Sequence, residues 1–402
     1  MRKAVVLFML LCATVAFAGA QGLVISRLRA GTDPNAVALR ANVDYIDRSY
    51  QSPFFLFRTR DGEDPHTAQQ RLLLDAQVVW AEDDAQVGAP ENEGLKVDKN
   101  KGSTLPAVGG RDTLYAKNTK MLKQVNFQPA LAGSPGRAVR IAILDTGLSP
   151  KPTYLWERVV AKINYVEIGK GPFDLPRGHD TNGNGIEDEG AGHGSMVTAL
   201  VDQMAPQAQL VIVRVADSDG YATAWTIIKG LTFAAKKGCE VANVSLGSLA
   251  RVPALSEVMD WCENQGLLVV APIGNDNLRA VRYPADISKV LCVAGISPDN
   301  TKAPFSNWDG ETDFSAPATG LASAWWDGDW ATWSGTSFAA PLVAGIVADS
   351  LRRTAARMRP FDIRQKIIGS GRGINYFNPD YDGELGTLVD HARLDRRLNP
   401  PQ

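Results

Sequence analysis

The stretch Val139-Arg140-Ile141-Ala142-Ile143-Leu144-Asp145-Thr146-Gly147 is the clearest guide to the fold of this chain. It is a short apolar run that ends in a carboxylate and a glycine. Runs this short and this apolar are typical of strands that are buried on both faces of a parallel sheet. Similar runs follow at residues 210–215, 241–245, 267–271 and 290–293. We therefore expect a parallel sheet built from these runs.

Helical patterns lie between the expected strands, at residues 195–204, 224–236, 254–265 and 338–353. This alternation predicts the α/β class, as a doubly wound, mostly parallel sheet with helices on both faces. Ligand sites in such sheets lie at the carboxyl ends of the strands. Asp145, Ser245 and Asn275 each come at or just after the end of an expected strand.

The first twenty residues differ in composition from the rest of the chain. Arg2 and Lys3 precede an apolar run, and small residues at Ala18 and Ala20 offer cleavage points. This is the layout of a secretory signal peptide, so we predict a secreted protein: extracellular, periplasmic or at the cell surface. An N-terminal membrane anchor is the alternative, but a membrane-spanning helix needs about 20 apolar residues and the run is shorter.

Two segments separate this start from the expected parallel sheet. Residues 21–88 show the order strand, helix, two strands, helix, strand, which predicts a small ferredoxin-like α+β domain. Residues 89–118 are rich in Gly, Pro, Asn, Lys and Glu without clear periodicity, so we expect a flexible linker that contains a maturation site. The large domain is then predicted to span residues 119–402.

Composition excludes little, but it narrows the partners. The 42 basic and 44 acidic side chains give a net charge of -2, so nothing suggests nucleic acid or an anionic membrane as a partner. Beyond the signal-like start three cysteines remain, Cys239, Cys262 and Cys292. An odd number leaves at least one thiol unpaired within the chain. Buried thiols are the simplest interpretation, and a Cys239–Cys262 bridge stays open.

The sequence Trp333-Ser334-Gly335-Thr336-Ser337-Phe338-Ala339-Ala340-Pro341 runs from a glycine turn into an apolar helix. Ser337 is therefore expected at a helix N-terminus, where backbone N–H groups lack intrahelical partners and favour developing negative charge. Pro341 is expected within the first turn, where a missing N–H costs little. A serine at this position could also serve only as an N-cap.

A nucleophilic serine needs a base and a carboxylate that orients the base. The four histidines are His66, His179, His193 and His391. His193 is the best candidate because glycines flank it and a helix follows it, whereas His179 lies in a polar loop. Asp145, at the end of a buried strand, is the best carboxylate. Each of these residues alone is more often structural, but the three contexts together predict catalysis.

These motifs resemble the subtilisin family of serine peptidases. Asp145-Thr146-Gly147, His193-Gly194 and Gly335-Thr336-Ser337-Phe338-Ala339-Ala340-Pro341 are similar to the family's three active-site blocks, and they occur in the order Asp, His, Ser that is typical of subtilisin. Ile273-Gly274-Asn275 resembles the block that carries the family's oxyanion asparagine. The resemblance covers residues 120–396 and implies that the domain of residues 21–88 is a propeptide, which assists folding and inhibits the enzyme until maturation.

The resemblance also implies where substrate binds. Gly220-Tyr221-Ala222 and Ser245-Leu246-Gly247 are similar to the two strands that hold the substrate backbone between them, which is strand addition to a sheet edge. The second strand, with Ile273 and Gly274, lines the pocket for the residue before the scissile bond. Pro272-Ile273 replaces the family's Ala-Ala, so a shallow pocket for small or medium apolar residues is expected. Met196 replaces a second histidine of the family, which is not catalytic.

A polar loop upstream of His193 predicts a metal site. Asp180-Thr181-Asn182-Gly183-Asn184-Gly185-Ile186-Glu187-Asp188 places oxygen ligands at alternate positions, as in an EF-hand-like calcium loop. The expected ligands are Asp180, Asn182, Asn184, Ile186 and Asp188. The position of the bidentate glutamate is Ala191, so a further carboxylate, from Glu187 or Glu189, is needed. A solvated turn is the alternative.

The sequence therefore predicts a secreted serine endopeptidase that cleaves proteins through an acyl-enzyme, made as a self-processing, monomeric precursor with no organic cofactor. A lipase or esterase is disfavoured because the chain lacks Gly-x-Ser-x-Gly and has the wrong triad order. Serine-carboxyl peptidases use Glu and Asp in place of histidine. A peptide ligase has no specific support. The alternative from another class is an inactive, subtilisin-like binding protein.

Overall fold

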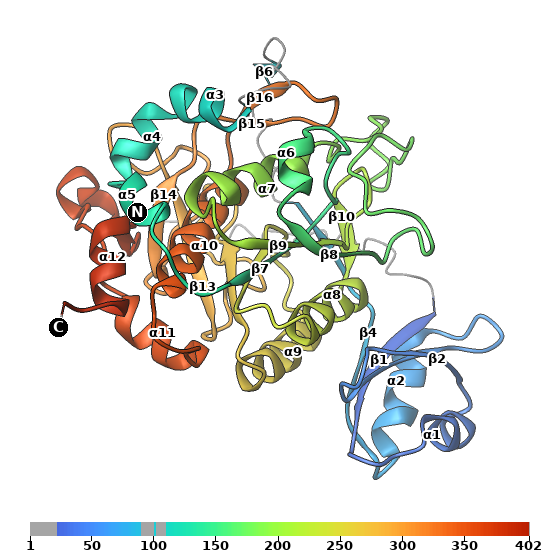
Figure 1. Cartoon of the computed structure of the whole chain (residues 1–402). Coiled ribbons are helices and arrows are strands. Elements are labelled where there is room, and N and C mark those ends of the chain that lie inside the picture. The colour runs from blue at the N-terminus through green and yellow to red at the C-terminus, as the bar shows by residue number, and fades with distance from the viewer. Residues whose placement is uncertain (1–21, 90–99, 102–109, 402) are drawn as a thin grey trace, which may run out of the picture.

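The computed structural model describes residues 22–89, 100–101 and 110–401. Figure 1 shows a large α/β body with a smaller N-terminal domain packed beside helices α8 (Ala224–Lys236) and α9 (Pro253–Asn264). The predicted signal peptide and most of the predicted linker lie outside the described residues.

The N-terminal domain is a four-stranded antiparallel sheet with order β2-β3-β1-β4. In chain order its elements are β1 (Leu23–Leu28), α1 (Pro34–Ala41), β2 (Asp44–Arg48), β3 (Phe54–Arg58), α2 (Pro65–Leu74) and β4 (Val78–Asp83). Val37 and Leu72 from the two helices pack with Val24 and Phe57 in one apolar cluster. The predicted ferredoxin-like topology is confirmed.

The large domain is built on eight parallel strands in the order β17-β14-β13-β12-β11-β7-β9-β8. Their bounds are β7 (Arg140–Asp145), β8 (Val159–Asn164), β9 (Gln209–Arg214), β11 (Val241–Val244), β12 (Leu268–Pro272), β13 (Val290–Ile296), β14 (Phe314–Pro317) and β17 (Thr387–Leu388). The predicted doubly wound α/β fold is confirmed. The strand order reverses beside the central strand β7, so the carboxyl ends of β7 and its neighbours are the expected place for a ligand site.

Alternate residues of β7 enter two different apolar cores, which explains why residues 141–144 are all apolar and do not alternate with polar residues. Ile141 and Ile143 join the cluster under α7 (His193–Met204) and α10 (Thr336–Arg352). Ala142 and Leu144 join the cluster under α8 and α9. A strand covered on both faces needs apolar side chains in both directions.

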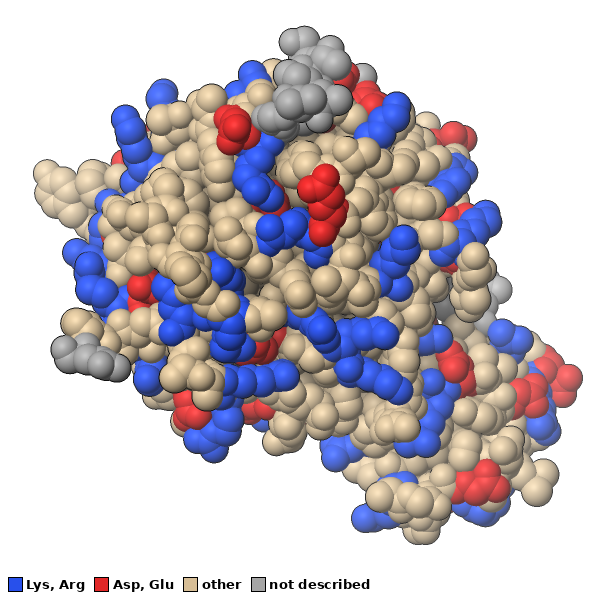
Figure 2. Space-filling model, viewed as in Figure 1, with Lys and Arg blue, Asp and Glu red and all other residues tan. Residues whose placement is uncertain are grey.

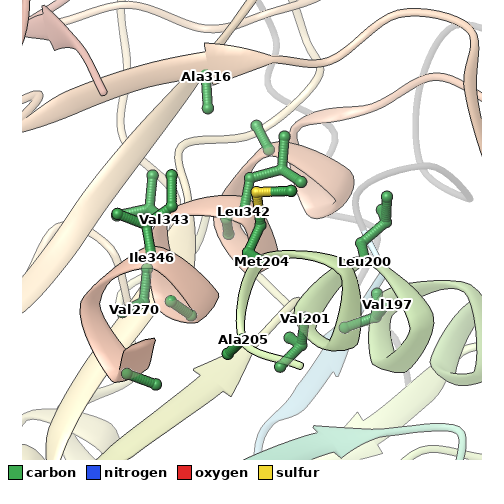
Figure 3. Packing of buried hydrophobic residues seen from close by; sticks show 14 of the residues in the cluster. Val197, Leu200, Val201, Met204, Ala205, Val270, Ala316, Leu342, Val343 and Ile346 are labelled. Atoms are coloured by element: carbon green, nitrogen blue, oxygen red, sulfur yellow. The ribbon is translucent and has the colours of Figure 1, made fainter. Parts of the chain in front are cut away.

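Helices α7 and α10 cross closely, and this crossing fixes the two residues His193 and Ser337 at their N-termini. Figure 3 shows Val201 and Met204 of α7 beside Leu342 and Ile346 of α10. A Cβ atom on Gly345 would lie 2.6 Å from Met204 Cβ, so the crossing requires glycine there.

The described residues form further, shorter elements around this sheet and its helices. They are β5 (Gln86–Gly88), β6 (Asn100–Lys101), α3 (Gly110–Lys117), α4 (Thr119–Gln124), α5 (Pro129–Ala132), α6 (Thr153–Trp156), β10 (Tyr221–Thr223), β15 (Leu321–Ala324), β16 (Trp330–Trp333), α11 (Pro360–Ile367), the short 3₁₀ turns Asn375–Phe377 and Pro379–Tyr381, and α12 (His391–Leu398).

Part of the predicted linker is regular structure. Residues 110–117 form α3, in which Leu114 is buried in the core and Arg111 pairs with Asp202 of α7 at 2.6 and 2.7 Å. The packed domain therefore begins before residue 119. This helix was not predicted because its contacts are with residues far away in the chain: Leu114 packs in the core, Arg111 pairs with Asp202 and the Tyr115 hydroxyl donates to the Gln203 carbonyl. Such contacts produce no apolar helical repeat.

The distribution of surface charge and the state of the three cysteines agree with the expectations from the composition. Basic and acidic side chains both spread over the face in Figure 2. Cys239, Cys262 and Cys292 are buried free thiols, so the Cys239–Cys262 bridge is not formed, and burial raises the pKa of Cys239 to about 12. Within the described part of the chain, no helix combines the length and apolar character that crossing a bilayer requires.

Candidate active site

Asp145 and His193 meet at the carboxyl end of β7. His193 Nδ1 lies 2.7 Å from Asp145 Oδ1, and both side chains are fully buried. Two glycines allow this approach: a Cβ atom on Gly194 would lie 2.3 Å from the carbonyl oxygen of Gly147. The start of α7 can therefore touch the turn after Asp145 only because residue 194 has no side chain, and a Cβ atom on Gly147 would lie 2.3 Å from the carbonyl oxygen of Pro172.

The Asp145 carboxylate fixes the role of each imidazole nitrogen. An ionised carboxylate only accepts hydrogen bonds, so Nδ1 must carry the proton that Asp145 Oδ1 receives. Nε2 is then the basic nitrogen of neutral His193. The rings of Trp333 and Phe338 lie 5.6 and 5.2 Å from the imidazole, centroid to centroid, and exclude water from its faces.

Ser337 is the second residue of α10, in the first turn, whose N–H groups have no acceptor within the helix. Its hydroxyl donates to the carbonyl of Ser245 at 3.3 Å. The Ser245 hydroxyl in turn donates to the Ser337 carbonyl at 2.9 Å. The end of β11 and the start of α10 are thereby held together.

The expected place of Pro341 was wrong. It is the sixth residue of α10, inside the helix and beyond the first turn, because α10 starts at Thr336 and not at Phe338. A proline has no N–H, so the Ser337 carbonyl, four residues earlier, receives no bond from it. Ser245 supplies that donor instead.

Asn275 lies after β12 and contacts the residue before Ser337. Its Oδ1 accepts from the backbone N–H and the hydroxyl of Thr336, at 2.9 and 2.8 Å. A backbone N–H can only donate, so this bond fixes which end of the amide is oxygen. The Nδ2 donor end lies on the opposite side of the amide.

A segment of the chain itself occupies the predicted substrate cleft. Strand β5 pairs antiparallel with β10, with Gly88 opposite Tyr221. Ala89 N also donates to the carbonyl of Gly220, directly before β10, at 2.9 Å. On the other side of the strand, Gly88 and Gly247 exchange two backbone hydrogen bonds, at 3.3 and 2.7 Å. The predicted cleft residues on both sides, Gly220 to Ala222 and Ser245 to Gly247, thus flank one extended strand.

The predicted pocket residues Gly247 and Gly274 contact a side chain that the sequence analysis missed. Arg282 is 1% exposed, and its Cγ and Cδ atoms would lie 3.0 and 2.9 Å from a Cβ atom on Gly274. Its Cβ would lie 3.1 Å from one on Gly247. Asp276 binds its guanidinium with two bonds, at 2.5 and 2.8 Å. Burial opposes ionisation of Asp276, but the hydrogen bonds and the charge of Arg282 outweigh burial, so the pKa of Asp276 is lowered.

The predicted metal loop is ordered by its own turns. Asp180 accepts from the N–H groups of Asn184 and Gly185, both at 3.0 Å, and Asn184 Oδ1 accepts from Ile186 N at 2.8 Å. The amide nitrogens of Asn182 and Asn184 lie 3.1 and 2.6 Å from Glu189 Oε2.

The five predicted ligands are not all brought together. The Asp188 carboxylate accepts from the N–H groups of Arg177, Gly178 and His179 instead. Within the described ranges, no group of three or more His, Cys, Asp or Glu side chains has the arrangement of a metal site. Hydrogen bonds instead link Asn182 and Asn184 to Glu189, and Asn184 N to Asp180.

Comparison with known proteins decides the family. The model of the subtilase family matches residues 136–386. The chain belongs to the subtilase family. Thermitase of Thermoactinomyces vulgaris is 32% identical to this subtilase over 243 residues, which are 59% of this chain and 84% of thermitase. The minor extracellular protease Epr of Bacillus subtilis (strain 168) is 28% identical over 308 residues, 75% of this chain and 45% of Epr.

Solved structures agree on the fold. The crystal structure of fervidolysin from Fervidobacterium pennivorans, described as a keratinolytic enzyme related to subtilisin, superposes with a TM-score of 0.71. The superposed region covers 94% of this subtilase and 61% of the fervidolysin chain. Because the two sequences are only 19% identical, this similarity shows the fold alone. By family, this chain is a subtilisin-like serine protease.

Proposed function

We propose that this subtilase is a secreted serine endopeptidase with Ser337 as nucleophile, His193 as base, Asp145 as the residue that orients His193, and Asn275 as oxyanion donor. The observation that carries the proposal is the buried 2.7 Å contact between His193 and Asp145 beside a cleft that holds an extended strand. Export is supported by the signal-like residues 1–20 and by the name of Epr, an extracellular protease.

The proposed reaction gives each of these residues one role. Ser337 Oγ attacks the carbonyl carbon of the scissile bond while His193 Nε2 accepts its proton. The oxyanion that forms is stabilised by the Asn275 amide and by the N-terminus of α10. His193 then gives the proton to the departing amine, and water hydrolyses the acyl-enzyme by the same steps in reverse.

The alternative, an inactive binding protein, is separated from the peptidase by labelling. A fluorophosphonate probe reacts only with an activated serine, so the mature protein is expected to be labelled at Ser337, and Ser337→Ala is expected to lose both the label and casein hydrolysis. Mass spectrometry locates the label. A matured, folded wild-type protein that takes no label would favour the binding function.

The N-terminal domain is proposed to be a propeptide that delivers its own C-terminus into the cleft. Besides β5, two carboxylates support this: Asp84 Oδ1 accepts from Trp225 N at 2.9 Å, and Glu82 Oε2 accepts from Ala254 N at 3.1 Å. These N–H groups belong to the first turns of α8 and α9, which need acceptors from outside the helix. The maturation site is proposed within residues 89–118, directly beyond β5. The matured enzyme is proposed to be a monomer.

Substrates are proposed to be unfolded or loop segments of proteins with a small residue before the scissile bond. The docked strand β5 is extended, as an added substrate strand would be. Arg282, rather than Pro272-Ile273, is the residue that limits the pocket, since it fills the space between Gly247 and Gly274.

Removing this obstruction is expected to change specificity. The variant Arg282→Gly with Asp276→Asn opens the pocket without leaving an unpaired carboxylate, and burying a Leu or Phe side chain there contributes about 1.5–3 kcal/mol. We expect kcat/KM for peptides with Leu or Phe before the cut to rise about 10- to 100-fold. A peptide library gives the profile, with Arg279→Gly, an arginine 65% exposed, as the control. A wild-type preference for Phe, or for Glu, at that position would contradict the proposal.

Calcium is proposed to bind the loop through Asp180, Asn182, Asn184 and Glu189, where it would stabilise the loop and take no part in the chemistry. The loop supports the cleft because Asp219, next to Gly220, accepts from Thr181 N at 2.8 Å. EDTA is expected to lower Tm by several degrees, since ligand binding stabilises the folded state by mass action. Glu189→Gln is expected to remove the effect. An unchanged Tm, with no calcium by elemental analysis, would exclude the site.

A further inference from the structure

The helix that carries His193 begins without a capping side chain of its own. Its N-cap is Gly192, which has φ 92° and sits against Trp325: a Cβ atom there would lie 2.7 Å from the Trp325 ring. The position therefore requires glycine, and a glycine cannot accept the N–H groups of the first turn. Those groups must find acceptors elsewhere in the fold.

Asp174, in the loop between β8 and α7, supplies these acceptors. Its Oδ1 accepts from Gly192 N at 2.9 Å, and its Oδ2 accepts from Ser195 N at 2.9 Å. The Ser195 hydroxyl also donates to Oδ2, at 2.7 Å, and the Thr146 hydroxyl donates to Oδ1, at 3.0 Å. The side chain of Asp174 is 1% exposed.

Each of the four contacts requires an acceptor at Asp174. Two are backbone N–H groups, which only donate. The Ser195 hydroxyl already accepts from Ser149 N at 2.9 Å, and the Thr146 hydroxyl already accepts from Gly194 N at 2.9 Å, so each has its proton left to donate. Four donors on two oxygens match an ionised carboxylate, and an amide in its place would set a donor against two of them.

The same network reaches the catalytic pair from both sides. Thr146 follows Asp145 directly, and its hydroxyl also lies 3.4 Å from Asp145 Oδ1. Gly192 and Gly194 flank His193. Asp174 therefore ties Thr146 to Gly192, before His193, and to Ser195, two residues after it, while Thr146 itself accepts from Gly194 N.

We propose that Asp174 is a positioning residue for the proposed peptidase reaction: its buried carboxylate holds the start of α7 and the turn after β7 in the register that lets His193 face Asp145. Its negative charge also favours the imidazolium that forms during the reaction, opposing the positive end of the α7 dipole. This inference rests on the proposed function.

Two charged groups on other elements act directly on Asp174: Asp145 at the end of β7 and Arg214 at the end of β9. Glu167 and Arg177, in the loop after β8, and Asp217, after β9, act on Arg214 in turn. Arg214 is fully buried and donates to the carbonyl of Phe173, next to Asp174. Burial, with the nearby charge of Asp145, raises the pKa of Asp174, although the bonds from Ser195 and Gly192 oppose the rise.

The test compares Asp174→Asn with Asp202→Asn in the full chain. Asp202 is a buried carboxylate on the same helix, 1% exposed and paired with Arg111, far along the helix from His193. For the enzyme matured from Asp174→Asn, kcat per fluorophosphonate-titrated site is expected to fall about 10²-fold with KM changed less than about twofold. The acid limb of the pH profile is expected to move to lower pH, because a negative charge near His193 is lost.

Asp202→Asn is expected to lower Tm and leave kcat and the acid limb unchanged. If Asp174→Asn matures too slowly for steady-state kinetics, the rate of self-cleavage of the folded precursor is measured instead. A rate at least about tenfold lower than that of Asp202→Asn supports the proposal. Equal kcat and an unmoved acid limb would overturn it, as would an Asp174→Asn chain that does not fold. Absence of labelling and activity in the wild type would instead reject the proposed function.

Discussion

Asp145→Asn is expected to reduce kcat about 10⁴-fold while the fold stays intact. The carboxylate accepts the proton of His193 Nδ1 at 2.7 Å in a site closed to water. An asparagine amide can present its NH₂ group there, which stabilises the other tautomer and leaves the proton on Nε2. His193 could then no longer accept the proton of Ser337. Steady-state kinetics per folded molecule, with Tm measured in parallel, give the effect.

The chain contains a matched control for this variant. His391 and Asp349 form a second fully buried pair, with Nε2 3.1 Å from Asp349 Oδ2 and with Gln128 N donating to Nδ1 at 3.1 Å. This pair lies away from Ser337 and joins α12 to α10. Asp349→Asn is expected to lower Tm without reducing kcat by more than about twofold. Equal losses of kcat in both variants would mean that Asp145 acts only through stability.

Docking of the propeptide is expected to weaken as pH rises. Burial raises the pKa of Glu82 from 4.5 to about 8, and that of Asp84 from 3.8 to about 6. The docked form thus takes up protons, so docking is most favourable below the ordinary carboxyl pKa and is progressively lost as pH rises through the raised values. Between pH 5 and 8 the dissociation constant of the cleaved propeptide is expected to rise about tenfold or more.

The matured sample, which contains the cleaved propeptide, is diluted into buffers from pH 5 to pH 9, and the fraction of enzyme that stays inhibited is measured. Glu82→Gln is expected to flatten the pH dependence because the amide does not ionise. Glu257→Gln is the control: it breaks the Arg27–Glu257 ion pair between the domains, at 2.6 Å, and should weaken docking without flattening its pH dependence. Tighter docking at pH 8 than at pH 5 would contradict the expectation.

Much of the site was predictable because its signals are local. A buried strand that ends in Asp145, a histidine between glycines and a serine at the start of an apolar helix each show within about ten residues of sequence. The parallel sheet then places strand ends side by side, as the alternation of elements implies. The ferredoxin-like order of the first domain was visible for the same reason.

Other features depend on contacts between residues far apart in the chain. Asp174 caps α7 from 18 residues upstream, in a loop with no periodicity. Arg282 lies against Gly247 and Gly274 because its segment pairs with Ser248 and Ile273. The exact start of α10 followed from Asn275, whose amide binds Thr336.

By itself the sequence determined which chemistry-bearing residues stand at the ends of which strands and helices, since apolar patterning and glycine turns are properties of neighbouring residues. Only the tertiary structure decided which buried carboxylate orients the helix start and which side chain fills the pocket. Those choices depend on the hydrogen-bonding and packing demands of buried groups, and such demands are met by whatever the fold brings within reach.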